Sequence, residues 1–527
     1  MGIRVSNGYQ YQASWYVFFG GLLITAALTP LVMRLARRIG AVDRGGYRRV
    51  YQGVMPLLGG LGIAIPIVGL CAGSYAVGAL IVSQWKWLAT HASHESFNSL
   101  FAFAQMRQEF ALLAVGSAVI LALGVVDDIR GLRARYKLAG QIAVALLFCF
   151  FGYTVKAVEI PWLGPVTFGP LWGAMVTVLW IVGLINAFNL IDGVDGLAAG
   201  TAFIIASGLA VLATVTGAAA VGGSALMVLV CAALAGSCLA FLVYNFNPAR
   251  VFLGDTGSMF LGYALGTLTL LGAHKTETAA IVMAPVFALG FPIFETCVSM
   301  LRRFVHGKPI FAADQHHTHH RLLKKGYTQR QTVILLYGAT LLCMIAAVLS
   351  QLLATHWIPI AIYGVTALGV AWLAGYLRPM TLASLSKDRQ RSSVLLALAR
   401  YAVLGMNSQL SRARPDDVLA LGRRELGLRF LEVWLEEGPA LLLTSGSINK
   451  ERQARFPFRL VEKMKVNSAD GKALVILYQF DYDPEPREQQ DVSACLAHVF
   501  QDIAVSELKA TAPLPKGVSE AKILAMD

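Results

Sequence analysis

The sequence predicts an all-α polytopic membrane protein with about eleven transmembrane helices, followed by a small α/β domain on the cytoplasmic side. Hydrophobic residues make up 56% of the 527 residues and charged residues only 14%, and the mean hydropathy is +0.60. Soluble globular proteins contain fewer apolar and more charged residues than this. In addition, apolar stretches long enough to cross about 30 Å of hydrocarbon recur along most of the chain.

Eleven apolar stretches have the length of a membrane-spanning helix. They lie near residues 15–36, 57–82, 109–126, 138–152, 170–187, 196–216, 224–244, 258–272, 279–301, 331–353 and 357–377. The first is too long for a signal peptide and lacks a small-residue cleavage site, so we expect it to be retained. Its glycines make the stretch 258–272 the weakest of these predictions.

The basic residues predict how the helices are oriented. Residues 1–379 contain 24 Lys and Arg against 12 Asp and Glu, so the net charge of +13 arises mainly between the membrane spans. The connections on one side carry 19 of these basic residues, and those on the other side carry 5. By the positive-inside rule the basic side is cytoplasmic, which places the N-terminus outside and the C-terminal tail inside. Because the basic surplus follows the topology, nucleic acid is not an expected partner.

Residues 380–527 are predicted to form a separate cytoplasmic domain after a transmembrane domain at residues 1–379. Their 20 Lys and Arg against 19 Asp and Glu are typical of a small soluble domain. The runs "PALLLTSG" and "KALVILYQF" predict strands, and "DVSACLAHVFQDIAVSEL" has helical periodicity. Further helices are predicted after Pro379 and from Pro415. The domain shows no phosphate loop and no nucleophile constellation, which favours a regulatory or partner-binding role.

Four polar clusters follow the third, fifth, seventh and ninth spans, all on the predicted cytoplasmic side. They are "GVVDDIRGLRARYKL" with Asp127 and Asp128, "NAFNLIDGVDGLAAG" with Asn189, Asp192 and Asp195, "YNFNPARVFLGDTGS" with Asn245 and Asp255, and "DQHHTHHRLLKKG" with His317, His319, His320 and Arg321. A single polar residue there could simply cap a helix. Ionisable groups in or beside a span are costly, however, and four clusters on one face indicate a shared site.

The residue types indicate a metal-assisted site for a phosphorylated substrate. Carboxylate and amide oxygens suit Mg²⁺, which binds through one or two carboxylates together with substrate phosphates. The glycines of "DGVDGL" and "LGDTGS" allow a close approach of the backbone to a ligand, and the histidines and basic residues supply donors to phosphate oxygens. A zinc site is less favoured, because no cysteine lies near the histidines. A transporter's proton relay would place its ionisable residues nearer mid-span.

The same motifs resemble a known family. "DD", "NAFNLIDGVDGL", "NPARVFLGDTGS" and "DQHHTHHRL" are similar to signature segments of the polyprenyl-phosphate N-acetylhexosamine-1-phosphate transferases of glycosyltransferase family 4. This family includes the undecaprenyl-phosphate N-acetylglucosamine-1-phosphate transferases and phospho-N-acetylmuramoyl-pentapeptide transferase. The resemblance covers roughly residues 15–377, and its motifs occur in the expected order.

The resemblance implies an enzyme that moves an N-acetylhexosamine 1-phosphate, preferably GlcNAc 1-phosphate, from a UDP-sugar to undecaprenyl phosphate or a similar lipid, releasing UMP. Such an enzyme initiates the synthesis of a cell-envelope polysaccharide, for example exopolysaccharide or lipopolysaccharide. We expect it in the inner (cytoplasmic) membrane of a bacterium as a homodimer, with its active site on the cytoplasmic face. Because two anions must meet, a cation, basic side chains and a position at the membrane surface are all required.

The resemblance also implies roles for individual residues. Asn189 and Asp255 would hold Mg²⁺, with Mn²⁺ as an alternative cofactor. Asp127, Asp128 and Asp192 would be catalytic, and Asp127 is preferred as the residue that orients or deprotonates the lipid phosphate. Asp195, Asn245 and Phe252 would surround the nucleoside. The pyrophosphate would be neutralised by His317, His319, His320 and Arg321.

Two features bear on specificity and on an alternative function. In "RRVYQGVMPLLGG", residues 48–60, Tyr51 occupies the position where the family usually has His, although Gly59 and Gly60 are retained. The histidine segment lacks the three consecutive histidines of the muramoyl-pentapeptide branch, which favours UDP-GlcNAc. The altered Tyr51 segment and the extra domain leave one alternative open, a non-catalytic membrane protein that binds or senses a UDP-sugar or carrier lipid.

Overall fold

The computed structural model describes residues 8–43, 55–84, 87, 103–160, 164–215, 225–274, 283–305, 317–353, 357–376, 428–435, 441–445, 462–467 and 473–480. Tyr51 lies outside these residues. The chain divides into two compact units, one comprising Met1–Met300 with Ala313–Arg378 and the other comprising Leu301–Ala312 with Pro379–Asp527.

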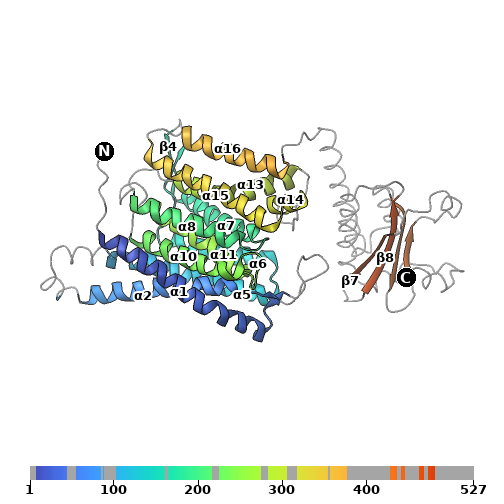
Figure 1. Cartoon of the computed structure of the whole chain (residues 1–527), viewed down its shortest axis with the longest axis horizontal. Helices are drawn as coiled ribbons and strands as arrows, with labels where there is room; N and C mark the ends of the chain where they lie inside the picture. The colour runs from blue at the N-terminus through green and yellow to red at the C-terminus, as the bar shows by residue number, and fades with distance from the viewer. Residues whose placement is uncertain are drawn as a thin grey trace. The chain divides into compact units, whose positions relative to one another are not determined.

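The first unit is a bundle of helices (Figure 1). The helices in chain order are α1 (Gly8–Ile39), α2 (Gly59–Ser83), α5 (Arg107–Arg130), α6 (Ala134–Phe150), α7 (Pro170–Ile191), α8 (Leu197–Val215), α10 (Ala225–Asn245), α11 (Gly254–His274), α12 (Met283–Ala288), α13 (Gly290–Val305), α14 (Thr318–Lys324), α15 (Gln329–Leu352) and α16 (Trp357–Ala374). Two short antiparallel pairs join them: β1 (Val42–Asp43) with β2 (Met55–Pro56), and β3 (Ala157–Ile160) with β4 (Gly164–Thr167). Apolar segments form helices here because hydrocarbon offers no hydrogen-bond partner to an open backbone.

Within the part of the chain that the structure describes, eight helices are long and apolar enough to cross a membrane: α1, α2, α5, α7, α8, α10, α15 and α16. This confirms the prediction of a mostly helical polytopic membrane protein. The other three predicted spans correspond to α6, which has 17 residues, to α11, and to the α12–α13 pair. The total of eleven spans therefore stays a prediction.

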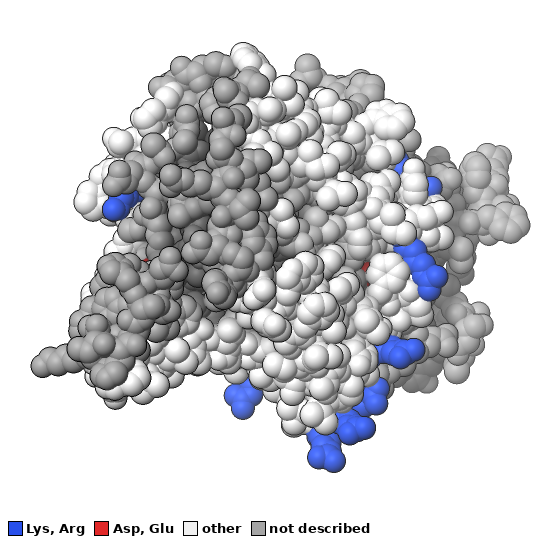
Figure 2. Space-filling model, turned by 60° about the vertical axis from the view of Figure 1, so that its left-hand side comes forward, with Lys and Arg blue, Asp and Glu red and all other residues white. Residues whose placement is uncertain are grey.

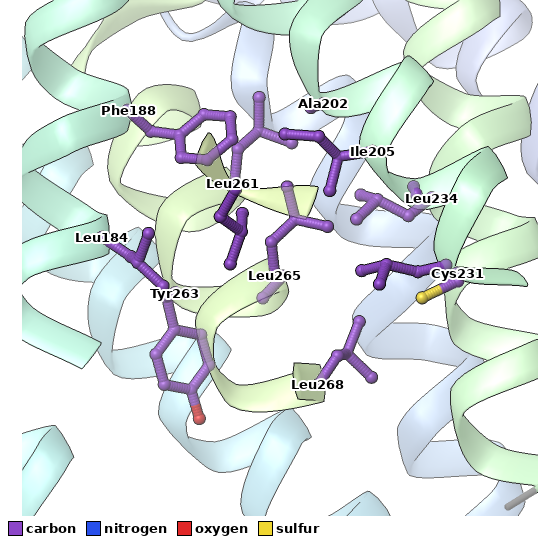
Figure 3. Packing of buried hydrophobic residues seen from close by; sticks show 14 of the residues in the cluster. Leu184, Phe188, Ala202, Ile205, Cys231, Leu234, Leu261, Tyr263, Leu265 and Leu268 are labelled. Atoms are coloured by element: carbon purple, nitrogen blue, oxygen red, sulfur yellow. The ribbon is translucent and has the colours of Figure 1, made fainter. Parts of the chain in front are cut away.

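Helix α11 forms the centre of the bundle although it is not among those eight. Every residue from 256 to 269 is buried. Figure 3 shows side chains of α11 packed among residues of α7, α8 and α10, including Leu184, Phe188, Ala202, Ile205, Cys231, Leu234, Leu261, Tyr263, Leu265 and Leu268. Because neighbouring helices separate α11 from lipid, it tolerates five glycines and three threonines among its 21 residues.

Glycines let two helices approach the start of α11 very closely. A Cβ atom on Gly60 of α2 would collide with the backbone of Gly257, and one on Gly124 of α5 would collide with the backbone of Thr256. The backbone N–H of Gly60 also donates a hydrogen bond to the carbonyl oxygen of Leu253 at 2.9 Å. The beginning of α11 is therefore fixed between α2 and α5.

The outer surface of this unit is suited to lipid. Large apolar side chains such as Phe150, Leu179 and Trp172 are exposed on its helices. Figure 2 shows a face that is mostly free of charge, with most of the visible Lys and Arg side chains along its lower and right-hand edge. Exposed basic side chains include Arg37 at the end of α1 and Arg130 at the end of α5. This separation of apolar and basic surface agrees with the charge pattern expected from the sequence.

Four strands of the second unit form an antiparallel sheet in the order β6–β5–β8–β7. The strands are β5 (Leu428–Leu435), β6 (Leu441–Ser445), β7 (Glu462–Asn467) and β8 (Ala473–Phe480). The two strands predicted from "PALLLTSG" and "KALVILYQF" are confirmed as β6 and β8. The strands β5 and β7 were not predicted. The helices predicted for this domain lie outside the described residues.

Two adjacent glycines of α1 provide a matched test of helix packing. A Cβ atom on Gly21 would lie 2.5 Å from the carbonyl oxygen of Ala233 on α10, whereas one on Gly20 would meet nothing within 4 Å. Overpacking of this kind costs about 1–3 kcal/mol. We predict that Gly21→Ala lowers the thermal unfolding temperature in detergent and that Gly20→Ala does not. Equal unfolding temperatures for the two variants would contradict the α1–α10 packing.

Candidate functional site

The polar clusters meet at one end of the helical bundle. The C-terminus of α5 carries Asp127 and Asp128, the C-terminus of α7 carries Asn189, the N-terminus of α11 carries Asp255, and α14 carries the histidines. Figure 1 shows α6 and α14 at the same end of the bundle. Segments up to 193 residues apart in the chain, from Asp127 to His320, thus contribute to one region. Asp255 is the residue at which α5, α6 and α7 meet α11.

Asp255 receives donors from two neighbouring helices. Its Oδ1 accepts a hydrogen bond from Nδ2 of Asn189 at 2.7 Å, and its Oδ2 accepts one from Nζ of Lys137 at 2.6 Å. Asn189 also donates to Oγ of Ser258, one turn further along α11, at 3.0 Å. Lys137, near the start of α6, forms a second ion pair with Asp127. The structure therefore brings Asn189 and Asp255 together, while their role as metal ligands stays a prediction.

The adjacent aspartates of α5 have different environments. Asp128 accepts hydrogen bonds from the backbone N–H groups of Asp255 and Thr256 at 2.8 and 3.0 Å, and from the Thr256 hydroxyl at 2.6 Å. It therefore caps α11 and ties that helix to α5. Asp127 accepts a hydrogen bond from the Leu132 N–H at 2.6 Å and otherwise pairs with Lys137. Of these two adjacent carboxylates, Asp127 is thus the one that does not cap α11.

Asp192 lies at the C-terminal cap of α7. Removal from water, together with repulsion from the carboxylates of Asp255, Asp128 and Asp195, raises the pKa of Asp192 well above its usual value. A site with this many acidic groups favours a positive ligand or a proton. The catalytic role of Asp192 stays a prediction.

The next residue, Gly193, connects this region to α14. A Cβ atom on Gly193 would collide with Nε2 of His319, which is 1% exposed and has no hydrogen-bond partner within the described ranges. The His319 ring lies 4.4 Å from that of His320 and 5.6 Å from that of His317, between centroids. Burial, with repulsion from His320 and His317, lowers the pKa of His319 well below its usual value. The low pKa favours the neutral imidazole, and the predicted contact of His319 with pyrophosphate stays a prediction.

The predicted nucleotide-binding residues fix the loop between α10 and α11. Oδ1 of Asn245 accepts a hydrogen bond from the Gly196 N–H at 3.0 Å, and its Nδ2 donates to the Val251 carbonyl at 2.9 Å. Oδ2 of Asp195 accepts hydrogen bonds from Nδ2 of Asn247 and from the Ala249 N–H, both at 3.1 Å. The N–H of Phe252 donates to the Pro56 carbonyl at 2.9 Å. These residues shape the loop next to Asp255, and their contact with a nucleoside stays a prediction.

Arg321 points to a different part of the bundle from the one expected. Its Nε and Nη2 donate to the carbonyl oxygens of Ala374 and Gly375 at 2.8 and 3.0 Å, and its guanidinium lies 4.3 Å from the centre of the Tyr376 ring. Lys325 donates to the Leu373 carbonyl at 2.7 Å. In this structure Arg321 holds α14 against the end of α16, and its role in neutralising pyrophosphate stays a prediction.

Lys137 is the central residue that the sequence analysis did not select. It was treated only as one of the basic residues that orient the helices. The sequence does show that Lys137 lies close to the aspartates in "DDIRGLRARYKL", nine residues after Asp128. This short distance along the chain was the available indication that the two could pair. The left-handed turn at Gly131 reverses the chain between α5 and α6, which brings Lys137 back to Asp127.

The donor set around Asp255 fits a hard divalent cation. Among the described residues, no three His, Cys, Asp or Glu side chains form a ready-made metal site. Mg²⁺ does not need one, because it commonly uses one or two carboxylates together with water and substrate phosphates. Asp255 and the amide oxygen of Asn189 would supply oxygen donors once the Asn189 amide is turned by 180°.

Fold and site together define a polytopic membrane protein with a carboxylate, amide and lysine cluster at one end of its helices. The sequence profile of glycosyl transferase family 4 matches residues 110–273 of the chain. This range includes Asp127, Lys137, Asn189 and Asp255. The profile therefore covers the cluster around Asp255, although it ends before the histidines of α14.

Known relatives match a longer part of the chain than the family profile does. The chain is 37% identical over 346 residues to a probable undecaprenyl-phosphate N-acetylglucosaminyl 1-phosphate transferase of Bacillus subtilis, covering 66% of this chain and 87% of the relative. It is 31% identical over 331 residues to a decaprenyl-phosphate N-acetylglucosaminephosphotransferase of Mycobacterium tuberculosis, covering 60% and 77%. It is 25% identical over 363 residues to the undecaprenyl-phosphate alpha-N-acetylglucosaminyl 1-phosphate transferase of Escherichia coli, covering 67% and 88%. The chain therefore belongs to the polyprenyl-phosphate N-acetylhexosamine-1-phosphate transferases of glycosyl transferase family 4.

Substitutions of the two adjacent aspartates should have different effects on stability and on catalysis. Asp128→Ala removes three hydrogen bonds at the start of α11, and a hydrogen bond to a charged acceptor contributes about 1.5–3 kcal/mol. We predict that Asp128→Ala lowers the thermal unfolding temperature more than Asp127→Ala, whereas Asp127→Ala abolishes sugar-phosphate transfer in a folded protein. Unfolding temperatures in detergent and transfer assays check this. A folded, active Asp127→Ala variant would be inconsistent with the assignment.

Proposed function

We propose that this protein transfers N-acetylglucosamine 1-phosphate from UDP-N-acetylglucosamine to a polyprenyl phosphate and releases UMP. A phosphate oxygen of the lipid attacks the β-phosphorus of the sugar nucleotide. The bond between that phosphorus and the oxygen bridging to the α-phosphate breaks, and UMP leaves with the bonding electrons. The observation that carries the proposal is the cluster of Asp127, Lys137, Asn189 and Asp255 in a chain whose relatives are named for this transfer.

The acceptor side of the reaction is assigned to Asp127 and Lys137. An incoming lipid phosphate would compete with the carboxylates for the ammonium group of Lys137, which is 26% exposed and so accessible from the bundle end. Asp127 beside it would orient the attacking phosphate or accept its remaining proton. A strong base is not required, because a phosphate with a second pKa of about 6 is largely deprotonated at neutral pH.

The donor side is assigned to the region between α7, α11 and α14. Asp255 and Asn189 would hold Mg²⁺ or Mn²⁺, which when bound would neutralise charge on the pyrophosphate. His317, His319 and His320 lie beside Asp192 through the contact of His319 with Gly193, and they would donate hydrogen bonds to phosphate oxygens. Asp195, Asn245 and Phe252 would support the nucleoside through the loop that they fix.

The membrane arrangement follows from the same assignments. We propose that α6, α11 and the α12–α13 pair cross the membrane together with the eight candidate spans, which gives eleven spans with the site on the cytoplasmic face of the inner membrane of a bacterium. At 21 residues, α11 is about 31 Å long, enough to cross the hydrocarbon core. The product would initiate a cell-envelope polysaccharide, and the protein would act as a homodimer.

We further propose that residues 380–527 form a separate cytoplasmic domain that regulates the enzyme or binds a partner. The four-stranded antiparallel sheet supports a folded domain in this part of the chain. Its charge balance, with 20 basic and 19 acidic residues, differs from that of the membrane region.

The central test is UMP release by the purified protein with undecaprenyl phosphate, UDP-N-acetylglucosamine and Mg²⁺. We predict release that depends on the lipid, stops with a chelator and returns when Mg²⁺ is added back. Asp255→Ala should lower the rate by about a hundredfold or more, because the cation and Lys137 would both lose their carboxylate partner.

Parallel reactions with other UDP-linked amino sugars test the sugar assignment. A faster reaction with one of these donors would change the sugar and leave the reaction class in place. No release with any donor, from a folded protein that still binds the nucleotide or lipid, would favour the non-catalytic binding or sensing protein instead.

A further inference from the structure

Helix α14 is too short to hold its own position. It has seven residues, Thr318–Lys324, and isolated helices shorter than about 12 residues are marginal in water. Its histidines can therefore stand beside Gly193 only if other helices fix both of its ends. Arg321 and Lys325 attach the C-terminal end of α14 to α16, as described above. The N-terminal end is attached to α13.

The contact with α13 is made by Glu295. Its carboxylate is buried, with the residue 1% exposed, and its Oε1 accepts a hydrogen bond from the backbone N–H of Thr318 at 2.7 Å. The same oxygen lies 3.6 Å from Nδ1 of His317. Ser299, one turn further along α13, places its hydroxyl 3.1 Å from that nitrogen. One face of α13 thus holds both the first helical N–H of α14 and the ring that precedes it.

The burial of this carboxylate requires an explanation. Placing a carboxylate in an apolar bundle is expensive unless donors compensate it, and Oε2 of Glu295 has no hydrogen-bond partner among the residues that the structure describes. Within the described part of the chain, Glu295 accepts a hydrogen bond from Thr318 and lies near Nδ1 of His317, both in the segment that enters α14. A buried carboxylate with these contacts is well placed to set the position of the segment.

We propose that Glu295 is a positioning residue of the transfer reaction. It anchors the first turn of α14, so that the rings of His317, His319 and His320 stay clustered and His319 stays against Gly193. Glu295 does not touch the reacting phosphates in this account, and it acts through the histidines. The kinetic part of this inference depends on the proposed function, whereas the anchoring of α14 does not.

The hydrogen bond between the Thr318 N–H and Glu295 can be removed by changing either residue. Glu295→Ala removes the acceptor, while Glu295→Gln keeps an oxygen of the same reach. Thr318→Pro removes the donor, and proline is tolerated at the first position of a helix, here after His317 with an extended backbone at ψ 157°. Thr318→Val keeps the N–H and loses only the hydroxyl contact with Tyr376. Comparing Thr318→Pro with Thr318→Val therefore isolates the N–H group.

Glu109 offers a matched control for loss of a buried glutamate. It is 7% exposed and lies in the first turn of α5. The 18 residues that separate it from Asp127 on this helix correspond to about 27 Å. Glu109→Ala should therefore disturb packing far from the histidines.

Hydrogen–deuterium exchange of the full-length protein in detergent tests the anchoring directly. We expect faster exchange of the amides of residues 319–324 in Glu295→Ala and Thr318→Pro, with unchanged exchange in α15. Glu295→Gln, Thr318→Val and Glu109→Ala should exchange like the wild type in this segment. Unchanged exchange of α14 in both Glu295→Ala and Thr318→Pro would overturn the proposal.

Transfer kinetics test the consequence for the reaction. We expect Glu295→Ala and Thr318→Pro each to lower kcat/KM for the sugar nucleotide by about tenfold to a hundredfold, with recovery in Glu295→Gln. The double variant should be no slower than the slower single variant, because both changes remove the same interaction. Fully additive losses, or wild-type kinetics in both single variants, would show that Glu295 does not act through α14. If the wild type transfers no sugar phosphate, the proposed function fails, and the exchange result alone decides whether Glu295 anchors α14.

Discussion

The carboxylate of Asp128 accepts hydrogen bonds from the backbone N–H groups of Asp255 and Thr256. This contact joins the end of α5 to the start of α11 and sets the position of the groups around Asp255. It orients the Asp255 carboxylate toward Asn189 and Lys137, which come from two other helices. Without the cap, the start of α11 would present open N–H groups in a crowded interior, where an unpaired donor costs about 1–3 kcal/mol. Asp128, which was predicted to be catalytic, therefore also fixes the start of α11.

The rest of the bundle makes this contact possible by bringing backbones unusually close. Glycines at positions 60 and 124 leave room for the first turn of α11, and the buried core around Tyr263 keeps the helix in place behind it. Because α11 is enclosed by protein, it can be less apolar than α7, α8 and α10. The five polar side chains of Asp127, Asp128, Lys137, Asn189 and Asp255 thus depend on a helix that neighbouring helices enclose. The polar groups lie at the start of α11, and the apolar side chains that bury the helix lie further along it.

Much of this arrangement could be predicted from the sequence, for identifiable reasons. Long apolar stretches predict membrane-spanning helices directly. Counting the spans shows on which side of the membrane each polar cluster lies. Asn189 and Asp255 fall on the same side, so they were expected to meet. Lys137 was missed because its charge also fits the positive-inside pattern, and only the turn at Gly131 shows that it folds back onto Asp127. The contacts of Arg321 with α16 could not be predicted either, since a basic residue beside histidines suggests a phosphate ligand and the spacing does not show its neighbours. Side-chain direction and partner choice depend on tertiary packing, which residue spacing does not encode.

The central claim is that the carboxylates of Asp127 and Asp255, balanced by Lys137, form the transfer centre. The most direct measurement is the transfer of labelled phosphate from UDP-N-acetylglucosamine, labelled at the β-position, into the lipid product by Lys137→Met and Lys137→Arg. Both variants would first be shown to be folded and monodisperse in detergent. The account predicts that Lys137→Met loses transfer by about a hundredfold or more, and that Lys137→Arg, which keeps the charge, loses less. Transfer by a folded Lys137→Met variant at close to the wild-type rate would contradict the account.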